Sequence, residues 1–564
     1  MSMTPTPLFS GPAGSRPGRQ LWRRRGTAAA LCTAAALTGL AAPAPSSGSS
    51  AFTAPAAPAA AAAPRRHLDL GPADLPETRT RTRLQRGVSL TRITRGINDP
   101  SLRWTEEMLI PAGSTSPDPD APPSSLSDRA SARAEAARLA DKGFDARVER
   151  VRQPRMADVE PGLLGFRVRV GRFLTQAEGD AEKARLAAAD ETAATVYTGW
   201  DGRRTDRGPW HVNVLRIDPR RFTGRLAGSF GPDLFQRETT SQLAQRRGST
   251  AAVNGGYFVL DPNSGAPGDP AGAGVYDGRV LSGSIDGRPA LVLHDDARHS
   301  AIRRTHRAMR MQLGGDLVAL DGINREPGLI RNCGGDRTDE PTSHPRHDFT
   351  CTDDAELVAF THEYADSTPS GPGREVVAEH GVVTSVSGSR GTALARGERS
   401  VQATGSDTDA LAGVRVGDRL RLRLRLRSHG ALLRTPPGTT VTNGGPLLMR
   451  NGEVRITQRR DGFVHPGEPS FSYGFVIKRN PRTFAGIDAK GRTVLITVDG
   501  RTAEDLGLSV RESADVARSL GLVDAINLDG GGSTTMVVHG AVISHPSDAT
   551  GERPVGDALL IGRR

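Results

Sequence analysis

Two carboxylates stand directly after strand-like apolar runs in the C-terminal part of the sequence. Asp499 follows the run Thr493–Val498 and is followed two residues later by Arg501, and Asp529 follows the run Leu522–Leu528. A strand that ends in charged residues delivers them to the edge of a sheet. Two carboxylates at such an edge can share acid, base or nucleophile roles in a hydrolysis, and a neighbouring guanidinium can bind an anion. We therefore expect Asp499 and Asp529 to be catalytic.

The residues around Asp529 add groups that could hold an anion. The strand period of two places Asn527 on the same face as Asp529, so this face is polar. Three glycines and two hydroxyl residues follow, and they can offer bare backbone N–H groups and hydroxyl donors. They are Gly530, Gly531, Gly532, Ser533 and Thr534. The same residues also fit a tight structural turn in which Asp529 accepts from its own turn amides, and the pattern favours neither alternative.

A third carboxylate, Glu512, lies between the two strands. The segment Ser509–Leu520 has apolar residues at helical spacing and predicts a helix. It begins with Ser-x-x-Glu, the pattern of a capping box, so Glu512 can close the helix N-terminus instead of acting in catalysis. Glu512 is therefore a catalytic candidate with a structural alternative.

These motifs lie in a long stretch, residues 208–564, that is predicted to be one large mixed α+β unit. It is rich in glycine, turn signals and strand-like alternation, and helices are fewer. The expected strands are 210–217, 251–253, 290–293, 419–427, 475–477, 494–498, 525–528 and 535–538. In the run Arg419–Arg427 leucine and arginine alternate, which places the leucines on one sheet face and the arginines in solvent. We expect a solvated strand face there and not a nucleic-acid motif.

The first 45 residues have the order of a secretory signal peptide. Arginines at 23–25 precede an apolar run that ends at Leu40, and small residues that suit cleavage follow. The run is shorter than the roughly 20 residues of a membrane span, and no later window is long and apolar enough to be one. We therefore expect a protein that is secreted or associated with the cell wall, with an uncleaved anchor as the alternative.

Two further segments precede the large unit. Residues 46–103 begin as an Ala/Pro-rich linker and continue as a poorly defined segment. Residues 104–202 contain two strand–helix–strand patterns, with strands at 104–110, 144–151, 166–173 and 193–200 and helices at 127–142 and 178–189. These patterns predict a small sheet with two helices.

The charge of the chain gives no sign of a nucleic-acid partner. The formal net charge is +11, and loss of the signal segment removes five arginines and no acid. The remaining arginines are spread along the chain and form no focused basic patch of the kind that nucleic-acid binding requires.

Two cysteines remain after the signal segment. Cys32 lies inside that segment, whereas Cys333 and Cys351 lie in the large C-terminal unit. In an oxidising compartment a Cys333–Cys351 disulfide would close a short loop and stabilise the fold by about 3 kcal/mol. Two unpaired buried thiols are the alternative, and two isolated cysteines lack the spacing of a structural zinc site.

The order of the motifs resembles the phosphodiester glycosidase family from about residue 209 to the end of the chain. The matching motifs are Ala252–Phe258, Asn443–Pro446, Asn480–Thr483, Val498–Arg501 and Asn527–Ser533. The resemblance implies hydrolysis of the bond between a sugar's anomeric carbon and a phosphodiester, with an N-acetylglucosamine-type sugar and no required cofactor. His545 departs from the family pattern, which has Asn or Arg beside the Pro-Ser pair at this place, so His545 receives no role.

The resemblance also implies roles for particular residues. Asp499 and Asp529 would supply acid, base or nucleophile chemistry, and Arg482 and Arg501 would contact the phosphate. Substrate positioning would fall to Asn254, Gly255, Gly256, Asn443, Asn527, Gly530, Gly531, Gly532, Ser533 and Thr534. Because phosphate is a good leaving group, anion binding by arginines and amides should matter more than a strong general acid.

Residues 104–202 resemble the SPOR domain, a small peptidoglycan-binding domain. The resemblance rests on the strand at 166–173 and the Ala/Glu-rich helix that follows it. It implies docking onto glycan strands of the cell wall, and a folding appendage is the alternative.

Two other functions stay open. A metal-dependent phosphodiesterase could use the plentiful Asp, Asn and His residues, although the sequence has no dense His/Asp cluster for two catalytic metals. The loop Asp261–Gly265 could hold a structural calcium ion. A non-catalytic cell-wall glycan-binding protein would keep the same domain without cleaving its ligand. The natural substrate, which we expect among the glycans of the cell envelope, is open as well.

Overall fold

The computed structural model describes residues 67–109, 124–285, 287–331, 338–342, 349–465 and 467–563. The predicted signal peptide, residues 1–45, and the first part of the predicted linker lie outside these residues. Among the described residues, no helix is both long and apolar enough to cross a membrane.

The largest sheet is antiparallel and has eight strands in the order β1-β2-β7-β30-β29-β31-β27-β28. The strands are β1 (Glu77–Gln85), β2 (Val88–Arg95), β7 (Trp210–Ile217), β27 (Leu447–Arg450), β28 (Glu453–Val454), β29 (Arg482–Asp488), β30 (Thr493–Val498) and β31 (Leu522–Asn527). The runs predicted at 210–217, 494–498 and 525–528 are confirmed as β7, β30 and β31, near the centre of this sheet. β30 is buried on both faces, which explains its uninterrupted run of apolar residues and threonine.

Two five-stranded sheets pack against the large one. The first has the order β33-β32-β9-β34-β8 and the second β11-β10-β26-β12-β13. Their strands are β8 (Arg225–Ser229), β9 (Ala251–Asn254), β32 (Met536–Val538), β33 (Ala541–Val542), β34 (Ala558–Gly562), β10 (Gly274–Tyr276), β11 (Arg279–Ser282), β12 (Pro289–His294), β13 (Ala301–Arg304) and β26 (Thr439–Asn443). Leu495 and Ile526 of the large sheet share one core with Val253, Leu559 and Leu291 of the others, so the sheets pack face to face.

Helices are few in this part of the chain. They are α3 (Thr240–Arg246), α4 (Pro469–Ser472) and α5 (Val510–Ser519). Helix α5 covers the second face of the large sheet, where Val510 and Ala514 share a core with Phe484 and Ile496. The predicted helix over 509–520 is thereby confirmed. The result is the mixed α+β fold expected from the sequence.

Residues 77–95 form a hairpin of the large sheet, which corrects the linker and poorly defined segment predicted over 46–103. β1 pairs with β2, and β2 pairs with β7. β1 alternates threonine and arginine and is exposed, so it lacks the apolar period that marks a strand. Val88 and Leu90 are buried on one face of β2, and Ile93 is buried on the other. The edge strand β1 therefore forms because it pairs with β2, whose own residues are partly buried, and not because its sequence is hydrophobic.

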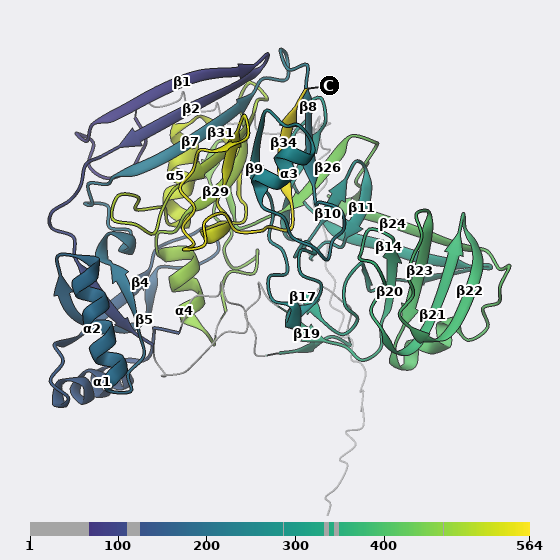
Figure 1. Cartoon of the computed structure of the whole chain (residues 1–564), viewed down its shortest axis with the longest axis horizontal. Helices are drawn as coiled ribbons and strands as arrows, with labels where there is room; N and C mark the ends of the chain where they lie inside the picture. The colour runs from purple at the N-terminus through teal and green to yellow at the C-terminus, as the bar shows by residue number, and fades with distance from the viewer. Residues whose placement is uncertain are drawn as a thin grey trace, which may run out of the picture. The chain divides into compact units, whose positions relative to one another are not determined.

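Residues 104–202 fold as predicted into a small antiparallel sheet, in the order β4-β5-β3-β6, with two helices. The elements are β3 (Trp104–Met108), α1 (Arg129–Asp141), β4 (Ala146–Gln153), β5 (Gly162–Phe173), α2 (Gln176–Ala188) and β6 (Ala193–Tyr197). Both helices cover one face of the sheet (Figure 1), where Val168 and Val170 pack with Leu139 and Leu186.

The opposite face of this small sheet is closed by polar contacts with the rest of the chain. Arg169 Nη2 donates to Glu107 Oε2 at 2.8 Å and to Asp201 Oδ1 at 2.8 Å. The Tyr473 hydroxyl donates to Glu107 Oε2 at 2.8 Å, and Lys478 Nζ lies 3.5 Å from Glu107 Oε1. The sheet is thus enclosed between its own helices and residues of the large C-terminal unit.

Residues 306–434 form a β-rich lobe, whose strands β14 and β20–β24 are grouped in Figure 1. Its sheets have the orders β15-β14-β24-β25, β16-β20-β23-β21-β22 and β17-β19-β18. The strands are β14 (His306–Leu313), β15 (Asp316–Ala319), β16 (Gly322–Ile323), β17 (Ile330–Arg331), β18 (Glu340–Pro341), β19 (Phe349–Thr352), β20 (Leu357–Thr361), β21 (Gly371–Glu379), β22 (Val382–Arg390), β23 (Glu398–Ala403), β24 (Leu420–Ser428) and β25 (Ala431–Leu432). The run predicted at 419–427 is β24, with its arginines exposed as expected.

The predicted disulfide involves this lobe. Cys351 is buried in β19, whereas Cys333 lies outside the described residues. The Cys333–Cys351 pair therefore stays a prediction.

The strand predicted at Phe475–Ile477 is wrong. Helix α4 continues into a π-helical turn over Tyr473–Ile477. Phe475 stacks on Phe471 within this segment, with ring centroids 5.7 Å apart and planes at 8°. This packing outweighs the local strand preference of the Phe-Val-Ile run.

Candidate active site

The two aspartate motifs predicted to be catalytic meet at one edge of the large sheet. Arg482, the first residue of β29, pairs with Val498 of β30. Pro481, the residue before β29, lies between Gly500 and Gly530. Both glycines pack closely on its backbone, since a Cβ built on Gly500 would be 2.7 Å from Pro481 N and one built on Gly530 would be 2.9 Å from Pro481 O. The motifs that follow β30 and β31 therefore flank β29, and their backbones are roughly 10 Å apart, two strand spacings.

Arg501 lies against the glycine loop of residues 530–533. A Cβ on Gly531 would be 3.1 Å from Arg501 Nη2, and Gly531 has a φ of +60° that favours glycine. Within the described part of the chain, the guanidinium bonds only to Asn480 Oδ1, at 3.2 and 3.3 Å. Arg501 therefore keeps unused N–H donors beside the loop, as an anion site requires.

Several buried polar atoms around this loop have no hydrogen-bond partner among the described residues. They are Asn527 Oδ1, Ser533 Oγ and Thr534 Oγ1. Leaving such an atom unsatisfied costs about 1–3 kcal/mol, so three together mark a place where a ligand or water completes the bonding. Asp529 Oδ1 accepts from Gly530 N at 2.9 Å. The structural turn thus exists, and it leaves the two hydroxyls unused.

Arg482 is a buried guanidinium without a carboxylate partner among the described residues. It is 2% exposed and donates to the carbonyl oxygens of Leu508, at 2.9 Å, and Phe475. Burial lowers the pKa of Arg482 to about 10, and the Arg501 charge acts in the same direction. Two uncompensated guanidinium groups near one loop favour a bound anion there. Arg482 supplies positive potential, while its bonds go to carbonyl groups.

Asp499 belongs to a cluster of two carboxylates and two histidines. Asp499 Oδ1 accepts from His545 N at 3.1 Å. Asp505 bonds to the Nδ1 atoms of both His211 and His545, the latter at 3.1 Å. Asp499 is 2% and Asp505 4% exposed, whereas the His545 side chain is 65% exposed. The cluster therefore connects a buried carboxylate to solvent through an imidazole.

The environment of the cluster sets its protonation. Burial, with a smaller effect of the Asp505 charge, raises the pKa of Asp499 to about 7. Burial also acts to raise the pKa of Asp505, but hydrogen bonds to His211 and His545 lower it below its usual range. The hydrogen bond to Asp505 raises the pKa of His211. A carboxyl group with a pKa near neutrality can both give and take a proton at pH 7.

The same cluster offers ligands for a metal ion. Asp499, Asp505 and His545 each present one ligand atom, and these atoms lie within 4.8 Å of one another. Two carboxylates and an imidazole suit a single ion such as Zn²⁺ or Mn²⁺. The predicted calcium loop Asp261–Gly265 forms a short 3₁₀ turn whose first residue accepts from Asn263 N at 2.9 Å. Calcium binding by that loop stays a prediction.

The side chains of two asparagines that were predicted to position the substrate form hydrogen bonds within the protein at this edge. Asn254, the last residue of β9, donates to Asp529 O at 2.8 Å and accepts from Thr483 Oγ1 at 2.6 Å. Asn443, the last residue of β26, donates to Tyr257 O at 3.0 Å and accepts from Tyr257 N at 3.1 Å. Their amides are used within the protein, and Asn254 fixes the backbone that carries Asp529.

The other predicted positioning residues continue this network. Gly255 N donates to Asp557 O at 2.9 Å, and Gly256 N donates to Asp557 Oδ1 at 2.8 Å. Asn527 Nδ2 donates to the Tyr257 hydroxyl at 2.8 Å. The ends of β9, β26 and β31 are thereby joined, so the three sheets position one site.

Glu512 is engaged in the predicted capping box. Ser509 N donates to Glu512 Oε2 at 2.9 Å, and Glu512 N donates to Ser509 Oγ at 3.2 Å. Arg479 Nη2 also donates to Glu512 Oε1 at 2.6 Å. Burial opposes ionisation, but this guanidinium lowers the pKa of Glu512. The capping-box alternative is confirmed. The Glu512 side chain forms hydrogen bonds with Ser509 and Arg479, and none of them supports a catalytic role.

Sequence reasoning missed four residues of this edge. His211 lies in β7, far from the motifs along the chain, and Asp505 lies in a loop without a periodic pattern. Asp548 and Arg553 form an ion pair, with Nε 2.7 Å from Oδ2, that lies directly against Gly532. The unassigned His545 was the one signal in the sequence that pointed to this region.

Comparison with known families matches two parts of the chain. The profile of the phosphodiester glycosidase family matches residues 372–562, which contain four of the five motifs. Residues 372–562 therefore form a phosphodiester glycosidase domain. A SPOR domain profile matches residues 124–198, within the region predicted at 104–202. The phosphodiester glycosidase domain therefore follows a SPOR domain, as expected.

Curated relatives match a part of this chain. The chain is 35% identical over 153 residues to the N-acetylglucosamine-1-phosphodiester alpha-N-acetylglucosaminidase of Bos taurus, which is 27% of this chain and 29% of that protein. The Homo sapiens protein of the same name is 34% identical over 152 residues, again 27% and 29% of the two chains. The matched part thus spans less than a third of these relatives.

Solved structures extend the similarity along most of the chain. One is the crystal structure of a "Putative exported protein" from Burkholderia pseudomallei K96243. It is 32% identical with a TM-score of 0.77, over 88% of this chain and 98% of that chain. A hypothetical protein from Synechocystis is 18% identical with a TM-score of 0.50, over 87% and 76%, and this likeness concerns the fold alone. The similarity to the Burkholderia structure includes residues before 372. This extent fits the sheets, because β7 and β9 pair with β30 and β34 of the phosphodiester glycosidase domain.

Proposed function

We propose that the protein hydrolyses the anomeric C–O bond of a sugar-1-phosphodiester and releases free sugar and a phosphomonoester. The observation that carries the proposal is the glycine loop at 530–533 with Arg501 against it. There, two unused buried hydroxyls and a guanidinium without a described carboxylate partner converge. The family, and the names of the curated relatives, support this substrate class and an N-acetylglucosamine-type sugar.

Binding of the phosphate would fall to Arg501 and the hydroxyls of Ser533 and Thr534. A phosphodiester carries one negative charge, and the leaving monoester gains a second when the C–O bond breaks. Donors that are already in place stabilise this added charge without reorganisation. Arg482 would add positive potential from its buried position.

Asp499 would handle the proton of the attacking water. Its pKa of about 7 allows it to accept a proton and to release it again near neutral pH. His545, which touches Asp499 and is exposed, would exchange that proton with solvent. The water oxygen becomes the anomeric hydroxyl, and the bridging oxygen leaves with the phosphate.

Asp529 would face the positive charge that develops at the anomeric carbon. Gly530 N holds its carboxylate at 2.9 Å, and Asn254 holds its backbone. A carboxylate in this place can stabilise an oxocarbenium-like state or attack the carbon. Either step leaves the P–O bonds intact.

Hydrolysis in H₂¹⁸O tests which bond breaks. The full chain is incubated with N-acetylglucosamine 1-(methyl phosphate), and both products are analysed by mass spectrometry. We expect ¹⁸O in the sugar and none in methyl phosphate, because water attacks carbon. Label in the phosphate, or no turnover by the parent protein, would overturn the proposal.

A metal-dependent phosphodiesterase is the second candidate, and the spacing of Asp499, Asp505 and His545 supports it. It would break the P–O bond with a metal-bound nucleophile. Under the first proposal, EDTA treatment leaves turnover unchanged. Loss of turnover that Zn²⁺ or Mn²⁺ restores, together with ¹⁸O in the phosphate, would favour the second candidate.

The site of action and the glycan partner are also proposals. The signal-peptide pattern supports export, and the SPOR domain supports binding to glycan strands of the cell envelope. Because Tyr473 and Lys478 close the sheet face opposite α1 and α2, glycan binding would use the other surfaces of this domain. Pelleting of the full chain with purified peptidoglycan tests this partner, and failure to pellet would contradict it.

A further inference from the structure

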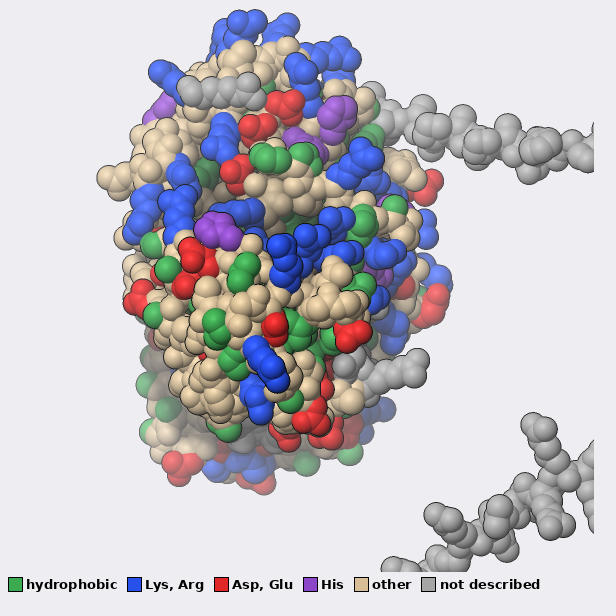
Figure 2. Space-filling model, turned by 90° about the vertical axis from the view of Figure 1, so that its right-hand side faces the viewer, with side chains coloured by type: hydrophobic (Ala, Val, Ile, Leu, Met, Phe, Trp, Pro, Cys, Tyr) green, Lys and Arg blue, Asp and Glu red, His purple; other side chains and the backbone are tan. Residues whose placement is uncertain are grey.

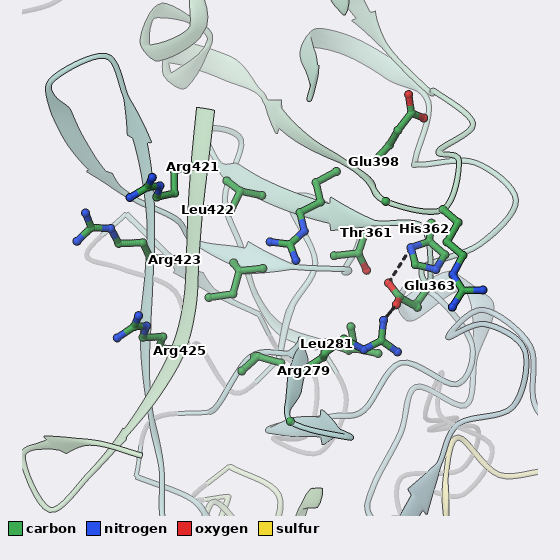
Figure 3. Close-up of a pocket in the computed structure, with 16 residues that line it drawn as sticks. Arg279, Leu281, Thr361, His362, Glu363, Glu398, Arg421, Leu422, Arg423 and Arg425 are labelled. Carbon is green, nitrogen blue, oxygen red and sulfur yellow. Dashed lines mark hydrogen bonds and ion pairs between the residues drawn. The ribbon is translucent and has the colours of Figure 1, made fainter. Parts of the chain in front are cut away.

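The outer face of the sheet β15-β14-β24-β25 carries a row of arginines. Arg421, Arg423 and Arg425 are exposed at alternate positions of β24. Figure 3 shows all three pointing to the same side of the strand, away from Leu422. On β14, Arg310 lies directly opposite Arg423 and is also exposed. We name these four residues the arginine face.

The arginine face has no acidic residue to balance it. The strand register places seven other residues on the same side of the sheet: His306, Ala308, Gln312, Leu317, Ala319, Arg427 and Leu432. None of them is acidic. Among the described residues, no carboxylate is close enough to pair with the arginine face, and Arg423 donates instead to Gln312 Oε1 at 2.7 Å.

Such a row destabilises the free protein. Alternate side chains on a strand are roughly 7 Å apart, which is within the screening length of about 8 Å at 0.15 M salt. Like charges that lie directly opposite across two strands, such as Arg310 and Arg423, also repel. A bound polyanion would relieve this repulsion.

A cleft of about 740 Å³ lies on the other side of β24, the side to which Leu422 points, so the arginine side chains point away from it (Figure 3). Arg396 and Arg399 line the cleft, as do Arg279 and its ion-pair partner Glu363. Lys and Arg side chains are frequent on this side of the molecule (Figure 2). The cleft contains no residue of the candidate active site, so it is a separate site.

We propose that the arginine face binds a phosphodiester-linked glycan polymer, the polymeric form of the substrate. The identity of the polymer rests on the proposed function. Such a chain carries one negative charge per repeat and can lie along β24, with a charge near each guanidinium.

The test compares two rows of three arginines. The chain offers a matched control in β1, where Arg79, Arg81 and Arg83 alternate on another exposed strand. One variant carries Arg421→Gln, Arg423→Gln and Arg425→Gln, and the other carries the same change at 79, 81 and 83. Both lose three charges, so net charge alone affects them equally. Circular dichroism and thermal unfolding establish that both variants fold.

Binding is measured first, without turnover. The probes are poly(glycerol phosphate), a single-stranded thymidine oligonucleotide with the same number of phosphates, and neutral dextran. We expect the parent to bind poly(glycerol phosphate) in preference to both others, and the β24 variant to bind it about tenfold more weakly at low salt. The β1 variant should bind it like the parent.

Turnover then separates this inference from the proposed function. The β24 variant should cleave N-acetylglucosamine 1-(methyl phosphate) with unchanged kcat and KM. On a polymeric N-acetylglucosamine 1-phosphodiester its KM should rise with kcat unchanged. Equal losses in both triple variants, a preference for the oligonucleotide, or no binding of poly(glycerol phosphate) by the parent would overturn the inference. Binding without any sugar release would instead contradict the proposed function alone.

Discussion

A nearly buried carboxylate beside a second carboxylate costs folding free energy when it ionises. Asp499 is in this position next to Asp505, and its raised pKa is the consequence. Below pH 7 the folded protein keeps the Asp499 proton that the unfolded chain, with a pKa of 3.8, has already lost. Between these two values stability therefore falls as pH rises. Such a cost is typical of residues that are retained for function.

Replacement of the Asp499 carboxylate should abolish activity and increase the stability of the folded protein. We expect Asp499→Asn to abolish sugar release and to raise the free energy of unfolding at pH 8 by on the order of 2 kcal/mol. At pH 4 the gain should vanish, because Asp499 is protonated in the parent. Denaturant unfolding at the two pH values measures this, and an equal effect at both would refute the assignment of the raised pKa.

Arg501 allows a second test at the same scale. Arg501→Gln should lower kcat/KM for a sugar-1-phosphodiester roughly 100-fold, because it removes a donor that faces the developing charge. The matched control is Arg492→Gln, at the other end of β30, whose guanidinium pairs with Asp488 at 2.6 Å. That variant should keep full activity, and an Arg501→Gln variant as active as this control would remove Arg501 from the site.

The glycine loop is the element that brings the two motifs together. Gly532 has no room for a side chain, since a Cβ there would be 2.2 Å from Asp548 Oδ1 and 2.3 Å from Arg553 Nη2. The absence of a side chain at Gly532 lets the loop pack against the Asp548–Arg553 ion pair. Its glycine content thus follows from close packing at Gly532 and from the positive φ of Gly531.

A methyl group at Gly532 should therefore displace the loop. We expect Gly532→Ala to lower kcat/KM at least about tenfold, in line with the sensitivity of catalysis to misplacement on the scale of 1 Å. Gly388→Ala in β22 is the control, because a Cβ there meets nothing within 4 Å. Equal activity of the two variants would show that the loop does not position the substrate.

At the scale of the whole molecule, the SPOR domain is attached to the phosphodiester glycosidase domain by buried charges. Burial acts against ionisation of Glu107, but Lys478, Arg169 and Arg167 lower its pKa to about 2. The Tyr473 hydroxyl completes the contact. A buried carboxylate held in this way stabilises the folded protein only while it is ionised.

Acid should therefore weaken this contact. The unfolded value is 4.5 and the folded value about 2, so the Glu107 contribution is present above pH 4.5 and is lost as pH falls toward 2. Glu107→Gln should lower the unfolding midpoint at pH 7 and have little effect at pH 2. Glu135→Gln, in an exposed pair with Arg138 at 2.7 Å, should have little effect at either pH. A pH-independent loss in Glu107→Gln would contradict this account.

Local patterns were sufficient where an element's own residues decide its structure. Helix α5 with its N-cap Ser509 shows apolar spacing and a capping box. Strand β30 is a run of apolar residues and threonine, and β7 and β31 are mostly apolar. The hairpin of β1 and β2 and the π-helical turn at Tyr473–Ile477 were missed, because a distant strand and an aromatic stack decide them.

The sequence by itself determined the α+β class, the order of the SPOR and phosphodiester glycosidase domains, and the loop and strand ends that carry Asp499, Arg501 and Asp529. These properties depend on periodicity and on residues that are neighbours along the chain. Only the tertiary structure brought His211, Asp505 and His545 to Asp499, and showed that Arg482 and Arg501 lack described carboxylate partners. Contacts between residues far apart in the chain, and the burial that shifts a pKa, arise only when the sheets pack.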